Sequence, residues 1–253
     1  DFMKAMIFAA GLGTRLAALT DSCPKALIEV GGKPMLRRVI ERLRDAGVGE
    51  MVVNVHHHAD MIRRYLEEND FGVRVMISDE SDMLLDTGGG VARASSLLEG
   101  DEPVMLYNAD IFTDFPIAEM VAVHERSGAD VTLLADSRAT SRYLMFDEVG
   151  YMRGWKNVRT GEVRSPFHAE VTDRCRLLAF GGIHIISQSA MRDISGYRPG
   201  EKFSITPFYI DRCGVLSIQA YTPTSPYKWI DIGKPETLQQ AREEYISFKK
   251  RTE

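Results

Sequence analysis

Apolar positions along the chain fall into two alternating patterns. Residues 4–9, 51–55 and 73–77 form short apolar runs of strand length. Between these runs, residues 35–46 and 60–68 carry apolar side chains at helical spacing, with charged residues on the opposite face. Strands and helices that alternate in this way predict βαβ units and an α/β fold, in which a mostly parallel sheet is flanked by helices.

The rest of the chain adds elements of both kinds and then changes character. Further helices are expected over residues 91–98, 117–126, 189–194, 205–211 and 236–248. Further strands are expected over residues 103–107, 130–135, 143–146, 151–155, 180–186 and 216–221. From residue 137 the strands are short and separated by turns, with a hairpin signal at Thr160-Gly161, which predicts a small antiparallel β insertion.

The loop after the first strand carries the most specific pattern in the chain. It contains Gly11 and Gly13, then Arg15, and it ends at Pro24-Lys25. Glycine lets backbone N–H groups point at phosphate oxygens, and an arginine can form a forked contact with an anion. Lys25 adds a second, mobile positive charge. Together these residues predict a clamp for a polyphosphate.

Two better-known glycine motifs fit this loop less well. A dinucleotide-binding fingerprint needs a third glycine where Leu16 stands, and Pro24 interrupts the helix that should follow. A P-loop needs Gly-Lys-Ser/Thr, whereas Gly13 is followed by Thr14-Arg15. The remaining alternative is an ordinary turn with a surface arginine, and turn chemistry does not explain the two cations.

Two segments of this region resemble the signature of the sugar-phosphate nucleotidyltransferases: A-A-G-L-G-T-R-L at residues 9–16 and P-K-A-L at residues 24–27. Further segments match that family in order at residues 85–90, 107–110, 154–156 with 180–183, and 229–233. The chain is most similar to the short uridylyltransferases that act on N-acetylmuramate 1-phosphate. This resemblance implies a Rossmann-like, GT-A-like nucleotidyltransferase fold.

The resemblance covers nearly the whole chain, and no linker, repeat or low-complexity segment interrupts it. We therefore expect one nucleotidyltransferase domain over residues 3–250. Within it, residues 3–136 would form the nucleotide-binding part. Residues 137–233 would cover the sugar and return to the sheet, and residues 234–250 would form the C-terminal helix.

The resemblance also implies roles for individual residues. It implies catalytic roles for Arg15, Lys25 and Asp110. It implies nucleotide binding by Ala9, Ala10, Gly11, Gly13, Thr14, Glu80, Thr87, Gly88 and Gly89. It implies sugar-phosphate binding by Asn108, Lys156, Gly181 and Gly182. The alternatives are a flexible surface turn for the glycines at residues 88–90 and a surface-hairpin lysine for Lys156.

Two carboxylates at the ends of strands predict a metal site. Asp110 follows the strand at residues 103–107, and Asp231 lies between Ile230 and Ile232, so its side chain faces away from theirs. Carboxylates at the carboxyl ends of strands open into the ligand crevice of an α/β sheet, and Mg²⁺ prefers such oxygen ligands. We expect Asp110 and Asp231 to hold one Mg²⁺ between them.

The run His56-His57-His58 is a rival metal site at the end of another strand. Consecutive residues of an extended segment point to alternating sides, so all three side chains cannot easily bind one ion. We interpret these histidines as loop residues near the nucleotide or as solvated side chains.

The composition argues against several classes of partner. The formal net charge of −5 disfavours a nucleic acid or an anionic membrane as partner. Cys23, Cys175 and Cys213 are odd in number and lack ligand spacing, which favours reduced thiols in a cytoplasmic protein. No apolar run of about 20 residues is present, so no membrane segment is expected. The oligomeric state is left open.

The chemistry that unites these residues is attack by a sugar 1-phosphate oxygen on the α-phosphorus of a nucleoside triphosphate, which gives a nucleotide sugar and pyrophosphate. A phosphate monoester has a second pKa of about 6, so the nucleophile is already deprotonated at neutral pH. The site must then supply alignment and charge neutralisation. UTP with an N-acetylmuramate-like 1-phosphate is the expected pair, for a cell-wall or surface-polysaccharide precursor. The alternatives are guanylyl or cytidylyl transfer to heptose 1-phosphate, mannose 1-phosphate or phosphocholine, and a non-catalytic nucleotide-sugar sensor.

Overall fold

The computed structural model of the chain describes residues 3–252, with the side chains of all of these except 17, 18 and 247–252. Its contacts divide the chain into two compact units. Unit 1 comprises Asp1–Leu84, Tyr107–Phe115 and Ser225–Glu253. Unit 2 comprises Leu85–Leu106 and Pro116–Thr224. These boundaries differ from the one expected between residues 136 and 137, and the single domain stays a prediction.

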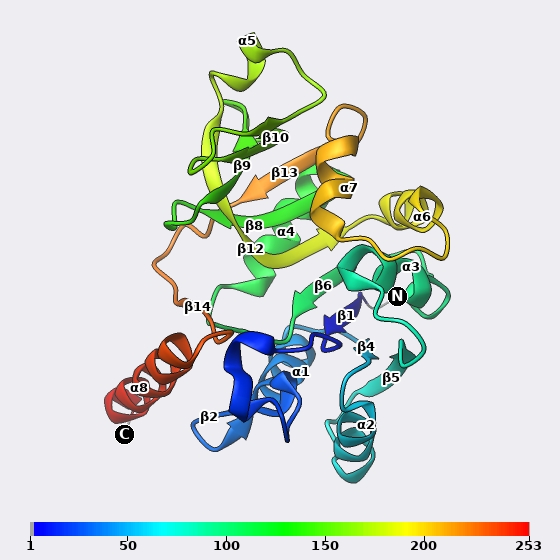
Figure 1. Cartoon of the computed structure of the whole chain (residues 1–253), viewed down its shortest axis with the longest axis vertical. Coiled ribbons are helices and arrows are strands. Elements are labelled where there is room, and N and C mark those ends of the chain that lie inside the picture. Colours follow the sequence, from blue (N-terminus) through cyan, green and yellow to red (C-terminus); the bar gives the residue numbers. More distant parts are fainter. Residues whose placement is uncertain (1–2, 253) are drawn as a thin grey trace. The chain divides into compact units, whose positions relative to one another are not determined.

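Unit 1 contains a parallel sheet whose strands follow the predicted pattern. β1 (Lys4–Phe8) pairs with β4 (Glu50–Val55), and β4 pairs with β5 (Arg74–Asp79), all in parallel. α1 (Met35–Asp45) and α2 (Ala59–Glu68) connect these strands, as Figure 1 shows. The apolar face of α1 is fully buried, because its apolar residues recur every three or four positions. The predicted βαβ arrangement is confirmed.

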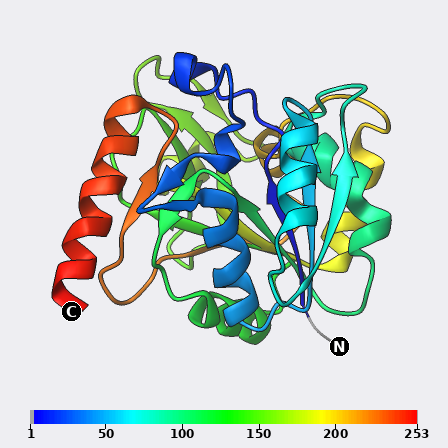
Figure 2. The same ribbon diagram turned by 90° about the horizontal axis from the view of Figure 1, so that it is seen from below.

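Unit 1 also contains two separate two-stranded sheets. β7 (Ile111–Thr113) pairs with β14 (Trp229–Asp231), and β2 (Glu29–Val30) pairs with β3 (Lys33–Pro34), both antiparallel. β14 is followed by α8 (Pro235–Thr252), which packs beside it (Figure 2).

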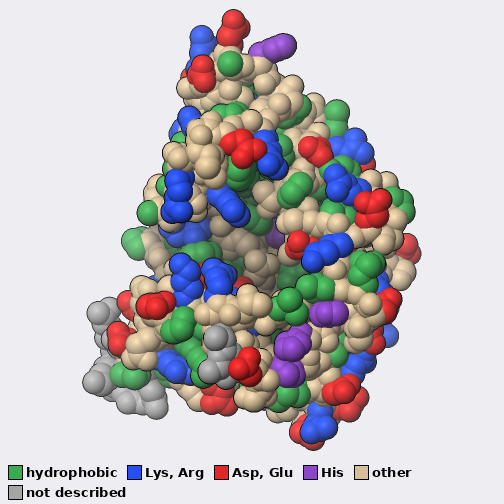
Figure 3. All heavy atoms as spheres, viewed as in Figure 1, with side chains coloured by type: hydrophobic (Ala, Val, Ile, Leu, Met, Phe, Trp, Pro, Cys, Tyr) green, Lys and Arg blue, Asp and Glu red, His purple; other side chains and the backbone are tan. Residues whose placement is uncertain are grey.

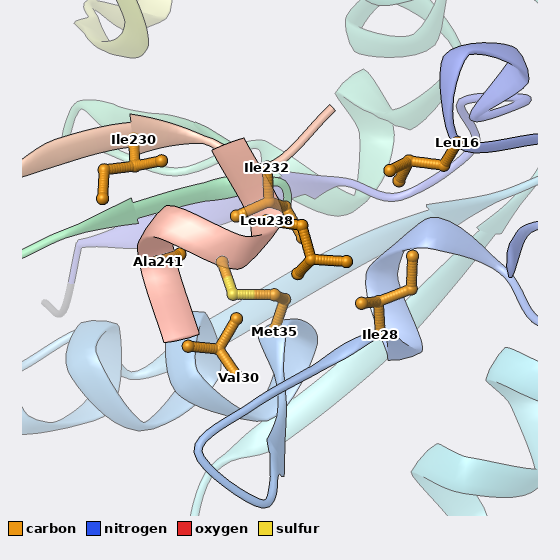
Figure 4. Packing of buried hydrophobic residues seen from close by; sticks show 8 residues of the cluster. All are labelled: Leu16, Ile28, Val30, Met35, Ile230, Ile232, Leu238 and Ala241. Carbon is orange, nitrogen blue, oxygen red and sulfur yellow. The ribbon is translucent and has the colours of Figure 1, made fainter. Parts of the chain in front are cut away.

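Figure 4 shows an apolar cluster that ties these segments together. Its buried members are Leu16, Ile28, Val30, Met35, Ile230, Ile232, Leu238 and Ala241. Burial of its leucine, isoleucine, valine and methionine side chains stabilises by about 1.5–3 kcal/mol each. The cluster anchors Leu16, which follows Arg15, and the two isoleucines that flank Asp231. It therefore holds two polar segments, distant in sequence, within one unit.

Unit 2 contains the antiparallel region that the sequence predicts. Its strands are β8 (Val131–Asp136), β9 (Arg142–Phe146), β10 (Met152–Asn157), β11 (Val163–Arg164), β12 (Arg176–Ile186) and β13 (Ile218–Tyr221). β12 pairs antiparallel with both β9 and β8, with a register shift between Phe180 and His184. β9, β10 and β11 form successive antiparallel pairs, whereas β13 runs parallel to β8.

The helices of unit 2 are α3 (Asp86–Leu98), α4 (Ile117–Ser127), α5 (Ala169–Thr172), α6 (Gln188–Tyr197) and α7 (Ile205–Arg212). β6 (Val104–Asn108) begins in this unit and ends in unit 1. The short helix α5 was not expected. Within residues 3–252, no helix is both long and apolar enough to cross a membrane.

α3 begins five residues earlier than predicted, at Asp86. Its first turn contains glycines, which are poor helix formers, so the sequence alone favours a later start. In the structure the carbonyl of Phe203 accepts the N–H groups of Gly88 and Gly89 at 2.9 and 3.1 Å, and the hydroxyl of Thr87 accepts from the N–H of Ile205 at 2.9 Å. A segment distant in sequence thus stabilises the first turn.

Candidate active site

The glycine loop after β1 has a defined shape in unit 1. Gly13 has φ of 65°, and a Cβ there would lie 2.7 Å from Cγ2 of Thr20. The hydroxyl of Thr20 donates to the carbonyl of Gly13 at 3.0 Å, and a 3₁₀ segment, η1 (Thr14–Leu19), lies between them. Only glycine suits position 13. Around Gly11 the space is open, since a Cβ there would meet nothing within 4 Å.

Four predicted site residues gather in unit 1 as a charged cluster: Arg15, Lys25, Asp110 and Asp231. Lys25 begins a second 3₁₀ segment, η2 (Lys25–Leu27), and its ammonium binds a carboxylate oxygen of Asp110. The same ammonium lies 3.7 Å from Asp231 Oδ1. Nη2 of Arg15 lies 3.7 Å from Asp231 Oδ2. The side chain of Lys25 is only 12% exposed, whereas that of Arg15 is 57% exposed and open to an anion.

Strand pairing explains why the two carboxylates meet. Asp231 is paired with Ile111 in the β7–β14 ladder, and Ile111 directly follows Asp110. The N–H of Ile232 donates to the carbonyl of Asp110 at 3.0 Å. Because side chains alternate along a strand, Ile230 and Ile232 enter the apolar cluster while Asp231 faces the other way.

Gly233 lies at the centre of this cluster, and the sequence reasoning did not single it out. A Cβ at position 233 would lie 2.7 Å from Nη2 of Arg15, 2.7 Å from Oδ1 of Asp231 and 2.8 Å from Nζ of Lys25. Its N–H donates to Oδ1 of Asp231 at 2.7 Å. Absence of a side chain at Gly233 therefore lets the charged groups converge. Its place two residues after Asp231, at the end of the strand Trp229–Asp231, was the available signal.

The donor set of this cluster fits a hard divalent cation. Asp110 and Asp231 are close enough for both to contact the ammonium of Lys25, so one cation can reach both carboxylates. In the described residues no group of three or more His, Cys, Asp and Glu side chains could hold a metal ion. Mg²⁺ needs few protein ligands, because it keeps water and phosphate oxygens in its octahedral shell. Without such a cation, Lys25 and Arg15 are the positive charges that face the two carboxylates.

Glu80 lies inside unit 1, with no part of its surface exposed. One of its carboxylate oxygens accepts from the side-chain amide of Asn54 at 2.8 Å. Its carbonyl contacts Nδ1 of His56 at 2.6 Å, and Nε2 of His58 contacts the carbonyl of Thr20 at 3.2 Å. Two of the three histidines therefore bind backbone carbonyls. The predicted contact between Glu80 and a nucleobase stays a prediction.

The predicted site residues of unit 2 lie in well-packed places. The N–H groups of Gly88 and Gly89 are not free, since both donate to Phe203. A Cβ on Gly181 would lie 2.9 Å from Cγ of Leu134, and Gly182 has φ of 70°.

Lys156 and Asn108 each lie at a strand position. In unit 2, Lys156 lies in β10, opposite Tyr143 of β9 and Val163 of β11. Asn108 is the last residue of β6 and belongs to unit 1. The substrate roles of Lys156 and Asn108 stay predictions.

Comparison with known proteins identifies the family. A family model described as nucleotidyl transferase matches residues 4–148. The N-acetylmuramate alpha-1-phosphate uridylyltransferase of Caulobacter vibrioides is 32% identical over 239 residues, which are 92% of each chain. The mannose-1-phosphate guanylyltransferase catalytic subunit beta of Dictyostelium discoideum is 39% identical over 134 residues, which are 52% of this chain and 37% of that protein.

The fold is shared with solved structures as well. The crystal structure of HddC from Yersinia pseudotuberculosis matches with a TM-score of 0.73 at 22% identity, over 96% of this chain and 99% of that one. This likeness shows a common α/β fold and confirms the predicted fold class. Together with the family match, it confirms the resemblance that the glycine loop indicated. The chain belongs to the nucleotidyl transferase family, and it is a nucleotidyltransferase.

Proposed function

We propose that this protein transfers a uridylyl group from UTP to an N-acetylmuramate-like 1-phosphate, giving a nucleotide sugar and pyrophosphate. The observation that carries the proposal is the convergence of Arg15, Lys25, Asp110 and Asp231 around Gly233 in unit 1. The relative from Caulobacter vibrioides, which is similar over 92% of this chain, supports the choice of substrates. A cytoplasmic place and a role in making cell-wall or surface-polysaccharide precursors belong to the same proposal.

In this proposal the cations of the cluster neutralise the triphosphate. Arg15 is exposed beside the glycine loop and can form a forked contact with phosphate oxygens. Lys25 is the counter-ion of Asp110 and Asp231, so it can turn to a phosphate only when another cation takes its place. The phosphates would be bound by the backbone of the loop, at Ala9, Ala10, Gly11, Gly13 and Thr14.

Asp110 and Asp231 would hold that second cation, for which we propose Mg²⁺. When bound, Mg²⁺ supplies charge neutralisation at the phosphate oxygens. The sugar 1-phosphate oxygen forms a new P–O bond at the α-phosphorus as the bond to pyrophosphate breaks. The chain need not take a proton from this nucleophile, because a phosphate monoester with a second pKa of about 6 is already ionised at neutral pH.

Residues outside the charged cluster complete the proposal. Thr87, Gly88 and Gly89 would bind the nucleoside, with Glu80 near the base. Asn108, Lys156, Gly181 and Gly182 would bind the sugar phosphate. Each of these roles rests on the family resemblance.

Guanylyl transfer to mannose 1-phosphate is the second candidate. It is favoured by the relative from Dictyostelium discoideum, whose identity to this chain is higher, 39%, although over only 52% of the chain. Both candidates use the same charged cluster, and they differ in the base and the sugar.

Pyrophosphate release tests the proposal directly. The protein is incubated with Mg²⁺, each of the four nucleoside triphosphates, and a panel that includes N-acetylmuramate, mannose, heptose and glucose 1-phosphates and phosphocholine. We expect the highest kcat/KM with UTP and N-acetylmuramate 1-phosphate. Preference for GTP with mannose 1-phosphate would favour the second candidate. Nucleotide binding without pyrophosphate release from any pair would overturn both and favour a sensor.

A further inference from the structure

A buried chain of hydrogen bonds links the glycine loop of unit 1 to the ends of two strands. Asn54 is 3% exposed and lies near the end of β4. Its Oδ1 accepts the N–H of Ala9, the first residue after β1, at 2.8 Å. Its Nδ2 donates to Oε1 of Glu80, which follows β5, at 2.8 Å. The start of the loop is thus tied to Glu80 through one amide side chain.

The far end of the same loop is held by the segment that follows β4. Nε2 of His58 contacts the carbonyl of Thr20 at 3.2 Å, and the hydroxyl of Thr20 donates to the carbonyl of Gly13 at 3.0 Å. His58 has φ of 54°, an uncommon conformation for a residue other than glycine. Histidine side chains also gather on the surface in the lower half of Figure 3. Asn54, near the end of β4, therefore contacts the start of the loop, and His58, shortly after β4, contacts its far end.

We propose that Asn54 and Glu80 are positioning residues, which fix the loop so that its open backbone faces the triphosphate. This inference rests on the proposed function for what the loop binds, but not for how the loop is held. We call Asn54, Glu80 and the contacts of Thr20 with His58 and Gly13 the loop clamp.

The direction of the hydrogen bonds makes Glu80 act through Asn54. The N–H of Ala9 is a donor, so the oxygen of the Asn54 amide must face it and the NH₂ group must face the other way. Oε1 of Glu80 accepts from Nδ2 of Asn54, so Glu80 suits the NH₂ side and opposes a flip of the amide. Glu80 thereby orders the acceptor that Ala9 needs.

The position of the clamp suits this role. Ala9 is 6% exposed, and the loop beyond it opens at Gly11, where the backbone has free space around it. Groups that stabilise a developing charge are most effective when they are held in place before the reaction. A loop that loses its anchor at Ala9 must be ordered by the triphosphate itself, which weakens binding.

Hydrogen exchange tests the anchor without requiring turnover. In Asn54→Ala, exchange of the Ala9 amide and of the amides at residues 11–14 should rise about tenfold or more, because their anchor is gone. The matched control is Thr132→Val in unit 2, which removes another buried polar group, the hydroxyl that hydrogen bonds with His124 and Gln219. This control should leave exchange in the loop unchanged. Unchanged loop exchange in Asn54→Ala, beside an intact fold, would overturn the proposal.

Two substitutions of Glu80 separate positioning from base reading. In Glu80→Gln the side-chain amide oxygen can still accept from Asn54, so this variant should raise the KM for the triphosphate less than Glu80→Ala does, and by the same factor for all four nucleobases. Asn54→Ala combined with Glu80→Ala should be no worse than Asn54→Ala alone, since the two act in one chain. A changed nucleobase preference in Glu80→Gln, or additive effects in the double variant, would overturn the proposal.

The two proposals can fail separately. If no triphosphate and sugar phosphate pair releases pyrophosphate, the proposed function fails, but loop exchange still decides the clamp. If Asn54→Ala does not fold, Thr20→Val removes the hydroxyl contact to Gly13 at the other end, and it should raise exchange at residues 11–14. Unchanged exchange there would overturn the clamp.

Discussion

Two glycines, Gly233 in unit 1 and Gly88 in unit 2, make room for different groups. In unit 1, a Cβ on Gly233 would meet Nη2 of Arg15 at 2.7 Å and Nζ of Lys25 at 2.8 Å, the ends of two flexible charged side chains. In unit 2, a Cβ on Gly88 would meet the ring of Phe203 at 2.2 Å and its carbonyl oxygen at 3.0 Å. The first glycine admits a charged cluster, and the second admits a packed aromatic ring.

This difference shows that a glycine in the sequence does not by itself indicate whether it serves a binding site or packing. The end of a lysine or arginine can move aside at little cost, whereas a buried ring and a carbonyl oxygen cannot. Substitution in the cluster of unit 1 should therefore reduce activity, and substitution at the packed glycines of unit 2 should reduce stability.

Removal of one of the carboxylates proposed to bind the metal should have the largest effect. We expect Asp231→Asn or Asp110→Asn to reduce kcat about a hundredfold or more, because the charge stabilisation by the proposed cation is worth several kcal/mol. The melting temperature should change little, since both side chains are partly exposed. Pyrophosphate release at saturating substrates, together with thermal unfolding, measures both.

A carboxylate outside the cluster provides the control. Asp45 in unit 1 is exposed and paired with Arg44, so Asp45→Asn should leave both rate and melting temperature near those of the unchanged protein. If Asp231→Asn kept most of its activity at millimolar-range Mg²⁺, the charged cluster of unit 1 would not be needed for catalysis.

A matched pair of glycine substitutions tests the comparison itself. Gly88→Ala should cost about 1–3 kcal/mol, because it overpacks against Phe203, and should lower the melting temperature by several degrees. Gly233→Ala should keep the melting temperature and lower kcat/KM about tenfold or more, because it pushes apart Arg15 and Lys25. Gly100→Ala is the control, since a Cβ there would meet nothing within 4 Å. Equal melting temperatures for Gly88→Ala and Gly233→Ala would contradict the expectation that Gly88 serves stability and Gly233 serves activity.

The sequence was sufficient where local spacing determines structure. Apolar runs and helical spacing predicted the strands and helices of the parallel sheet in unit 1 and the antiparallel strands of unit 2. Strand ends with a carboxylate led to Asp110 and Asp231, because alternation along a strand turns Asp231 away from its apolar neighbours.

The sequence was insufficient where contacts join distant residues. Lys25 pairs with Asp110 across 85 positions, and Thr87 accepts from Ile205 across 118 positions. Neither pairing leaves a periodic pattern in the chain. Asn54 gave a weaker signal, because it is a polar residue inside the apolar run at residues 51–55. Its partner is the backbone N–H of Ala9, which almost any residue would supply, so the sequence does not mark it. The early start of α3 was missed for the same reason.

Lys156 tests whether unit 2 contributes to activity as well as to stability. It lies in β10 of unit 2, yet it is proposed to bind the sugar phosphate. A lost charge-assisted contact should raise the KM for the sugar phosphate about tenfold in Lys156→Ala, with a much smaller change for the triphosphate. Lys156→Arg should restore part of the loss. Equal effects on both KM values, or no effect, would favour the alternative that Lys156 is a surface lysine of a hairpin.

The smallest effect concerns a buried polar pair of unit 2. His184 of β12 hydrogen bonds with the hydroxyl of Tyr209 of α7, and both side chains are buried. Burial lowers the pKa of His184 from 6.5 to about 3, because the charged imidazolium cannot be hydrated there.

Between pH 6.5 and 3 the unfolded chain binds a proton that the folded chain does not, so His184 makes the free energy of unfolding fall as the pH falls. The loss should reach about 1 kcal/mol by about pH 5.5. Chemical unfolding at about pH 7 and about pH 5.5 measures it. His184→Asn should be less stable at neutral pH but should lose less stability on acidification, whereas His168→Asn, at an exposed position, should keep the original dependence. The same pH dependence in all three proteins would show that the buried pair of unit 2 does not govern this transition.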